Sequence, residues 1–429
     1  MAVSVALRPI FPIRHPLIDK RVRVPASKSV ANRELVLSAI ADGRSRLRLG
    51  PLDPGDDVRA MRQAIAGLGY PVEWDQTGSI TVTGAGGRPP FAEPTLNAGE
   101  GGTVARFAAA LATLGTGRST IDGSERLRER PMAPLLAALR ELGANVEGDT
   151  LPVQITGPLA GGEVAVAGGQ SSQFASALLL VAPRMRDGLH LRITGGLVSA
   201  PFVELTVASL AARGVRVERP APHEFVVRPQ RVKARSFDIP GDATAATYPA
   251  AAAAILGGSV TVIDVDAHER PGIQGDVRFF SLLEQMGCSV SRGGSAVTVR
   301  REGELHGIVT DVQDCSDTFP TLAVVAAFAR EPTEISGIAH TRRQESDRIA
   351  AVAAGLRAVG AGATAYASAL RIDPAPLHSG VVDACGDHRI AMAFSVLGLQ
   401  VPGVAIEGSD VVSKTFPDFY TMLKELGSR

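Results

Sequence analysis

The chain has 429 residues, which is too long for one compact core and suits two domains of about 200 residues. Its Lys+Arg and Asp+Glu totals are both 44, so no net charge favours a nucleic acid or an acidic membrane, and an aromatic content of 4% argues against base-stacking surfaces. The cysteines, Cys288, Cys315 and Cys385, are far apart, which disfavours a disulfide framework or a zinc site. Residues 1–16 lack the apolar run of a signal peptide, and the alanine-rich stretch 250–256 is too short to span a bilayer. We therefore expect a cytoplasmic protein that binds no metal, no nucleic acid and no membrane.

A recurring pattern runs along the chain, in which an amphipathic helix ends at a glycine and leads into a short strand. Glycine suits this position because the chain after a helix adopts left-handed φ/ψ values. The glycines are separated by 74, 71, 73, 73 and 67 residues, and they are Gly69, Gly143, Gly214, Gly287, Gly360 and Gly427. Alternating runs such as SITVTG, PVQITG, AVTVR and LRID predict strands among these helices. Six such repeats predict two similar α/β domains with three repeats in each.

The boundary between the third and fourth repeats is predicted within residues 237–255. A strand is followed there by the breaker Pro240-Gly241 and by an alanine-rich helix capped near Asp242 or Thr244. Two equal lobes that face each other would form a cleft, which is the usual place for a small-molecule site.

Lys28 lies in the first segment that has a chemical pattern, residues 25–43. This segment predicts a helix with one apolar stripe, and its first turns carry Ser27, Lys28, Ser29, Asn32 and Arg33. Unpaired N–H groups and the positive end of the helix dipole favour an anion there, although a serine cap with solvated charges would give the same pattern. The chain has only five lysines, and unlike arginine a lysine can give up a proton.

Two further segments place arginines near predicted helix starts. In residues 97–115, a glycine-rich loop that includes Gly102 precedes a helix expected to begin near Thr103. In residues 124–143, three arginines lie just before Pro131, which predicts the first turn of a helix, and they are Arg126, Arg128 and Arg130. Such residues suit a carboxylate or phosphate, but a tight turn and a solvated loop are open alternatives.

The remaining segments place polar residues at the starts of apolar helices. In residues 168–183, Ser171, Ser172 and Gln173 open a helix, where they could hold a phosphate or simply cap it. In the C-terminal half the charged members are Asp317, Glu345, Asp347, Arg348, Asp387, His388, Arg389 and Lys414. Any one of these could belong to a surface salt bridge of little energetic value.

In chain order these segments resemble the enolpyruvyl transferases. The motifs that carry the resemblance are SKSVANR (27–33), RERPM (128–132), SSQF (171–174), ESDR (345–348), DHRIAM (387–392) and KTFPDF (414–419). The resemblance implies two similar inside-out α/β domains, each of three βαβαββ units, with the active site in the interdomain cleft. We accordingly expect a discontinuous first lobe of residues 1–26 plus 241–429 and a second lobe of residues 27–240.

The implied reaction transfers the enolpyruvyl group of phosphoenolpyruvate to the 5-hydroxyl of shikimate 3-phosphate and releases phosphate, without a cofactor. It requires side chains that move protons inside a cationic pocket. By the same resemblance Lys28 would shuttle a proton, Asp317 would accept one from the attacking hydroxyl, and Glu345 would exchange one with the methylene carbon. His388 is a fourth catalytic candidate, and a monomer is expected.

The resemblance also implies the residues that hold the two substrates. Phosphoenolpyruvate would contact Arg130, Gln173, Arg348, Arg389, Lys414 and the amides near Gly102, and shikimate 3-phosphate would contact Ser29, Arg33, Ser171, Ser172 and Ser199. Gln344 stands where the family often has a lysine near the shikimate phosphate, and Arg342 or Arg343 is a candidate to replace that cation. Glu100 and Gly101 also depart from the usual asparagine and alanine.

Two other functions remain open at this point. The sibling that uses UDP-N-acetylglucosamine typically has a cysteine in the loop that corresponds to residues 118–130, where this chain has none. A catalytically idle anion-binding protein on the same fold is the second alternative. The joint presence of Lys28, Asp317, Glu345 and Lys414 argues against it.

Overall fold

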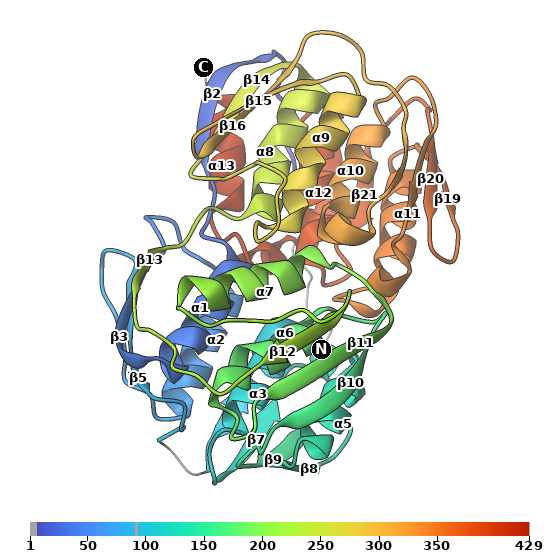
Figure 1. The fold of residues 1–429 in the computed structure, drawn as a ribbon. Coiled ribbons are helices and arrows are strands. Elements are labelled where there is room, and N and C mark those ends of the chain that lie inside the picture. The colour runs from blue at the N-terminus through green and yellow to red at the C-terminus, as the bar shows by residue number, and fades with distance from the viewer. Residues whose placement is uncertain (1–6, 91–92, 429) are drawn as a thin grey trace, which may run out of the picture. The chain divides into compact units, whose positions relative to one another are not determined.

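The computed structural model describes residues 7–90 and 93–428, which divide into two compact lobes (Figure 1). The first lobe contains residues 7–25, 241–269 and 275–428, and the second contains residues 26–90, 93–240 and 270–274. Residues 1–6, 91–92 and 429, which the predicted domains include, lie outside the described residues. Within the described ranges no helix is long and apolar enough to cross a membrane.

Each repeat of the second lobe combines a buried helix, a partly exposed helix and a sheet. The first repeat comprises α1 (Lys28–Ile40), α2 (Asp56–Gly67) and the sheet of β13 (Ser236–Asp238), β3 (Asp42–Arg48), β5 (Ser79–Ala85) and β4 (Val72–Trp74). The second comprises α3 (Gly102–Ala112), the short α4 (Glu125–Glu129), α5 (Ala133–Glu141) and the sheet of β6 (Thr95–Asn97), β7 (Arg118–Asp122), β9 (Val153–Thr156) and β8 (Asn145–Glu147). The third comprises α6 (Gln173–Val181), α7 (Pro201–Ala212) and the sheet of β10 (Gly162–Gly168), β11 (Leu189–Leu197) and β12 (Glu224–Val227).

The first lobe repeats the same combination. Its first repeat comprises α8 (Ala243–Leu256), α9 (Arg278–Gln285) and the sheet of β2 (Leu17–Arg23), β14 (Gly258–Ile263), β16 (Ala296–Arg301) and β15 (Ser289–Gly293). The second comprises α10 (Phe319–Ala326), α11 (Arg348–Ala358) and the sheet of β17 (Val309–Asp311), β18 (Thr333–Ser336), β20 (Leu370–Asp373) and β19 (Gly362–Ala365). The third comprises α12 (His388–Gly398), α13 (Phe419–Gly427) and the sheet of β21 (Gly380–Asp383), β22 (Val404–Glu407) and β1 (Leu7–Pro9).

The strand pairing confirms the predicted βαβαββ repeats. Each four-stranded sheet has one parallel pair followed by two antiparallel pairs, as in β6–β7, β7–β9 and β9–β8. In each lobe the first repeat takes one strand from a distant part of the chain, because β13 pairs with β3 and β2 pairs with β14. The third repeat of each lobe is abbreviated to a three-stranded sheet among the described residues.

The helices α1, α3 and α6 of the second lobe, and α8, α10 and α12 of the first, form the core of their lobes. In the first lobe α8, α10 and α12 pack on one another (Figure 1). The expectation of a single apolar stripe on the helix that follows Ser27 is wrong, because every residue of α1 from Val30 to Ile40 is buried. Its charged side chains have partners inside the lobe instead, whereas the buried Asn32 side chain has no hydrogen-bond partner among the described residues. A carboxylate oxygen of Glu34, for example, lies 2.7 Å from a guanidinium nitrogen of Arg213, which is equally buried in the second lobe.

The glycines that define the repeats have the predicted conformation at five of six positions. Gly69, Gly143, Gly214, Gly287 and Gly360 follow α2, α5, α7, α9 and α11 with φ between +80° and +103°. The expectation is wrong for Gly427, which is the last residue of α13. The four alternating runs are confirmed as β5, β9, β16 and β20.

Candidate active site

Lys28 begins α1 and forms a buried ion pair that the sequence analysis missed. Ser27 caps this helix, and its hydroxyl donates a 2.7 Å hydrogen bond to Gln274. The Lys28 Nζ atom lies 3.1 Å from an Asp57 carboxylate oxygen, and both side chains are largely buried. Asp57 is in the first turn of α2, where the helix dipole favours a carboxylate. This acidic helix start in the run PGDDV was the signal that could have identified it.

The glycine-rich loop before α3 joins this pair to two arginines. A Cβ atom on Gly101 would lie 3.1 Å from the Asp57 carboxylate, and one on Gly102 would lie 2.9 Å from the guanidinium atoms of Arg106 and Arg130. The absence of a side chain at these two positions thus lets the loop pack closely against Asp57 and the two guanidinium groups. α3 begins at Gly102, one residue before the predicted start at Thr103.

Arg106 and Arg130 are both buried beside this loop. Arg106 donates a 2.5 Å hydrogen bond to the side-chain carbonyl of Gln173 and a 2.7 Å bond to the backbone carbonyl of Pro131. It thereby links α3 to the first residue of α6. We define the Lys28 cluster as Lys28, Asp57, Gly101, Gly102, Arg106, Arg130 and Gln173. Its charged side chains are three cations and one carboxylate, which favours an anionic ligand.

Arg33 is a buried cation one turn after Ser29. It donates to the Ser29 carbonyl at 2.7 Å, to the Thr206 hydroxyl at 2.8 Å and to the Phe202 carbonyl at 2.9 Å. These acceptors are neutral, and burial lowers the pKa of Arg33 to about 9. The predicted contact of Arg33 with substrate stays a prediction, since most of its donors are already engaged by the protein.

The four predicted serine ligands lie at the starts of three helices of the second lobe, with Ser29 in the first turn of α1. Ser171 accepts a 3.2 Å hydrogen bond from the Gln173 backbone, and Ser172 precedes α6. Ser199 precedes α7 and has φ of +52°, a left-handed conformation that is uncommon for a residue other than glycine. Such strain is frequent at binding sites, and it singles out Ser199 among these serines.

Arg348 is the centre of the charged group in the first lobe. Its side chain is only 1% exposed and contacts three carboxylates: Asp387 at 2.7 Å, Glu345 at 2.8 Å and Asp317 at 2.9 Å. Burial alone would lower the pKa of Arg348, but these carboxylates outweigh burial and raise it above its usual value. The possibility that these residues form only surface salt bridges is therefore wrong for Arg348 and Asp387, which are both fully buried.

Two more cations contact the carboxylates of this group. Arg389 lies 2.6 Å from Asp317, and Lys414 lies 3.3 Å from Glu345. We define the Arg348 cluster as Asp317, Gln344, Glu345, Arg348, Asp387, Arg389 and Lys414. Asp387 is committed to Arg348 and to capping α12. Asp317 and Glu345 retain 24% and 11% of their side-chain surface, so they are the carboxylates of the cluster that a ligand can reach.

Gln344 and His388 both contact other members of this group, and their predicted roles toward substrate stay predictions. The side-chain carbonyl of Gln344 accepts a hydrogen bond from Arg348. His388 is completely buried in the first turn of α12, with its Nδ1 atom 3.6 Å from Asp387. Without exposed surface, His388 is better suited to positioning Asp387 than to contacting a substrate.

Arg342, a candidate replacement for the missing lysine, is engaged by other residues of the first lobe. It binds both carboxylate oxygens of Asp347 at 2.6 and 2.9 Å and the backbone carbonyl of Tyr366 at 2.7 Å. Asp347 in turn caps α11. Arg343 is exposed. The geometry therefore gives Arg342 a structural task at this helix start.

Asp276 is a buried carboxylate that the sequence analysis did not single out. One of its oxygens accepts a hydrogen bond from Thr244 in the first turn of α8, and the other has no hydrogen-bond partner. Burial raises the pKa of Asp276 to about 7, and the negative charge of Asp317 acts in the same direction. Asp276 thus lies close enough to the Arg348 cluster for the charge of Asp317 to affect its pKa.

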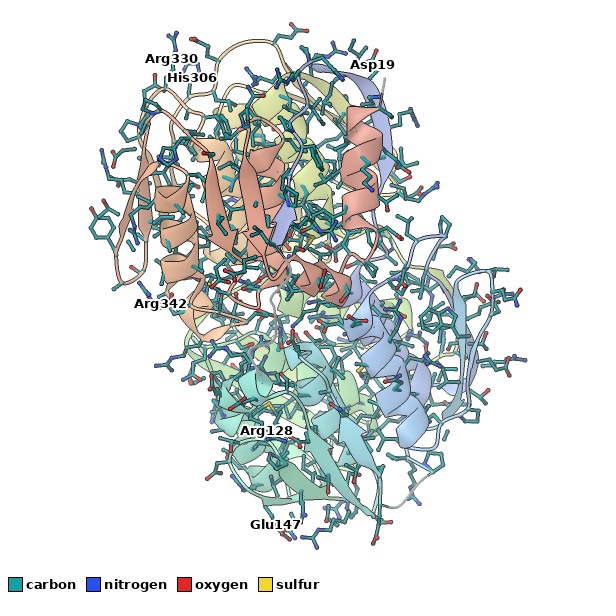
Figure 2. All side chains as sticks on the ribbon, turned by 180° about the vertical axis from the view of Figure 1, so that it is seen from behind. Asp19, Arg128, Glu147, His306, Arg330 and Arg342 are labelled. Atoms are coloured by element: carbon teal, nitrogen blue, oxygen red, sulfur yellow. The ribbon has the colours of Figure 1, made fainter. Side chains whose placement is uncertain are left out.

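The expected group of three arginines in residues 124–143 is divided by the structure. Arg126 and Arg128 are part of α4, where they form surface ion pairs with Glu129 and Asp122. Arg128 is labelled in Figure 2. Only Arg130 is buried. The predicted helix start at Pro131 is also wrong, because α5 begins at Ala133 and has Pro134 in its first turn. The close spacing of these arginines in the sequence suggested that they act together. Because residues two apart on a helix point in different directions, that spacing does not bring their side chains to one place.

No group of three or more His, Cys, Asp or Glu side chains in the described ranges is arranged to hold a metal ion. The expectation that the protein needs no metal and no cofactor stays a prediction.

Comparison with known proteins assigns the chain to a family. Residues 15–423 match the family model described as EPSP synthase (3-phosphoshikimate 1-carboxyvinyltransferase). The chain belongs to the EPSP synthase family. A relative from Methanosphaerula palustris named 3-phosphoshikimate 1-carboxyvinyltransferase is 42% identical over 96% of this chain and 97% of its own length. A relative of the same name from Methanoculleus marisnigri is 40% identical over 95% and 96%.

The fold of a solved member agrees with this assignment. The EPSP synthase structure from Acinetobacter baumannii has a TM-score of 0.81 and 27% identity, and the match covers 98% of both chains. The resemblance inferred from the motifs is therefore confirmed, as are the α/β fold class and the membership of a family of enolpyruvyl-transferring enzymes.

The raised pKa of Asp276 predicts how stability changes with pH. In the unfolded chain this carboxyl loses its proton near its usual value of 3.8, whereas the folded protein retains it until about 7. Stability therefore falls as pH rises between these values, and the full loss is present above pH 7. Asp276→Asn, which cannot ionise, should raise the Tm at about pH 8 and leave it nearly unchanged at about pH 4.

The matched control is Asp19→Asn, which removes an exposed carboxylate of the first lobe (Figure 2). It should show no such pH-dependent gain. An Asp276→Asn variant with the same Tm difference from the wild type at both pH values would contradict the buried-acid interpretation.

Proposed function

We propose that the chain transfers the enolpyruvyl group of phosphoenolpyruvate to the 5-hydroxyl of shikimate 3-phosphate and releases phosphate. The observation that carries this proposal is the Arg348 cluster, in which the reachable acids Asp317 and Glu345 are held by one guanidinium and flanked by Arg389 and Lys414. The names of the relatives, at up to 42% identity over nearly the full length, favour the same reaction.

The charges of the two clusters suit different tasks in this chemistry. The addition step must remove a proton from a hydroxyl and add one to a methylene carbon, and the elimination step must reverse this traffic. We assign Asp317 to the hydroxyl and Glu345 to the methylene carbon, because each carboxylate is paired with two cations and retains exposed surface that a substrate can reach. Lys28 is the remaining proton carrier, and its pairing with Asp57 keeps the ammonium in place.

Both substrates carry phosphate and carboxylate groups, which require fixed cations. In our proposal Arg348, Arg389, Lys414 and Arg130 bind phosphoenolpyruvate, with Gln173 and the amides near Gly102. Guanidinium groups suit this role because they bind carboxylate and phosphate in a bidentate manner. Ser29, Ser171, Ser172, Ser199 and Arg33 bind shikimate 3-phosphate, with Gln344 near its phosphate. The use of both clusters on the same pair of substrates, in a cleft between the domains, stays a prediction, as do the cytoplasmic location and the monomeric state.

Release of phosphate from the two substrates tests this function directly. The purified protein should release inorganic phosphate only when shikimate 3-phosphate and phosphoenolpyruvate are both present, and 31P NMR should detect the enolpyruvyl product in equal amount. Release that requires UDP-N-acetylglucosamine instead would establish the sibling reaction. Tight binding of both substrates with no release would establish an idle anion-binding protein, and either result would overturn the proposal.

Lys28→Arg separates a proton carrier from a simple binding charge. The variant keeps a positive charge next to Asp57, but a guanidinium does not give up its proton. We expect kcat for phosphate release to fall by at least about 100-fold, the usual contribution of general acid–base catalysis. Lys233→Arg, at an exposed lysine of the second lobe, should keep near-normal turnover. Near-normal kcat in Lys28→Arg would reduce Lys28 to a binding contact.

A further inference from the structure

A preformed groove lies in the first lobe, away from the Arg348 cluster. It has a volume of about 520 Å³ and is lined by residues 8–15 together with Leu399, Tyr420, Leu423, Lys424 and Gly427. This volume is within the range of roughly 300–1,000 Å³ that is typical of small-molecule sites. A smaller hollow of about 350 Å³ adjoins it on the other side of residues 12–15.

The wall formed by residues 10–13 is held rigidly. The Ile10 amide donates a 2.9 Å hydrogen bond to the Val404 carbonyl, and the Ile13 amide donates one of 2.8 Å to the Leu399 carbonyl. Ile10 also packs so closely on α12 that a Cβ atom on Gly398 would lie 2.8 Å from its own Cβ atom. A ligand would therefore not have to order this segment on binding, which favours affinity.

The lining is apolar on the inside and cationic at its edge. Phe11 contributes an aromatic ring that is 79% exposed, and the partly exposed Pro12 and Ile13 add apolar surface above the buried Ile10, Leu399 and Leu423. The charged lining residues are Arg8, Arg14 and Lys424, with His15 beside them, and no Asp or Glu side chain of residues 7–90 and 93–428 lines the groove.

Arg8 is the cation that is best placed to receive an acid. Its guanidinium lies 4.0 Å from the centre of the Tyr420 ring, and its Nε atom donates a 3.2 Å hydrogen bond to the Ser409 hydroxyl. The ring and the hydroxyl fix the plane of the guanidinium without neutralising its charge. A planar, fixed guanidinium of this kind matches the two oxygens of a carboxylate.

From this combination we propose that the groove binds a small apolar carboxylate, meaning an aromatic or branched hydrocarbon group that bears one carboxylate. An inorganic anion would leave the apolar lining in contact with water, and a neutral apolar compound would leave the three cations without a counter-charge. Only a molecule with both features uses both parts of the lining. This proposal does not depend on the reaction that the Lys28 and Arg348 clusters catalyse.

The proposal can be tested by 19F NMR with 4-fluorophenylacetate as the probe and the full-length chain. Saturating phosphoenolpyruvate is present throughout, so that the catalytic clusters are not available to the probe. We expect saturable binding of 4-fluorophenylacetate and no saturable binding of 4-fluorobenzylamine, which has a similar ring and the opposite charge. Equal binding of both probes, or no saturable binding of the acid, would overturn the proposal.

Variants at exposed positions then locate the site with little risk to folding. Arg14→Glu/Lys424→Glu should weaken binding by about tenfold or more, because two attractive charges become repulsive. Phe11→Ser should also weaken it, by removal of apolar contact. Arg216→Glu/Arg228→Glu makes the same change of charge at two exposed residues of the second lobe and should alter the Kd by less than about twofold.

An equal loss in the groove variant and in the Arg216/Arg228 control would contradict the proposed location. Binding that appears only after deletion of residues 2–6 would also overturn the proposal, since the natural occupant of the groove would then be the N-terminal segment of the chain.

Discussion

The contact of one buried guanidinium with three carboxylates is the interaction on which the first lobe depends. Arg348 begins α11, Asp317 precedes α10 and Asp387 caps α12, so this side chain joins the starts of three helices. Removing charges from water is unfavourable, and only several good hydrogen bonds compensate for it. Loss of Arg348 would remove the cation that the three carboxylates share, although Asp317 would keep its contact with Arg389 and Glu345 its contact with Lys414. For this reason the cluster is a unit and not a set of separate pairs.

Core helices that begin with polar residues explain how each lobe assembles its cluster. A helix start presents unpaired N–H groups and a positive dipole, so it can hold anions, caps and carboxylates at little expense in stability. In the second lobe α1, α3 and α6 bring together an excess of cations, whereas in the first lobe three cations face three carboxylates. The Lys28 cluster is therefore suited to binding anions, and the Arg348 cluster combines anion binding with acids that can move protons.

Much of the fold was predictable because it is repeated and local. The glycines after helices, the alternating strands and the Asp242 cap follow from short-range rules, and six occurrences reinforced one another. The pairing of Lys28 with Asp57 was not predictable from spacing, because it joins the starts of two helices through a tertiary contact. Asp276 was missed for the same reason, since its neighbours Thr244 and Asp317 are distant in the sequence. The short α4, which separates Arg128 from Arg130, is too brief to have a recognisable period.

Replacement of Arg348 by lysine is the most direct test of this account. A lysine keeps the charge but cannot contact three carboxylates in one plane. We expect kcat for phosphate release to fall by at least about 100-fold, as general acid–base catalysis is lost. We also expect the Kd for shikimate 3-phosphate, measured by calorimetry on the folded variant, to rise much less than kcat falls, because Arg33 and the four serines assigned to that substrate lie outside the Arg348 cluster. Near-normal turnover, or an equal loss in turnover and in shikimate 3-phosphate binding, would contradict it.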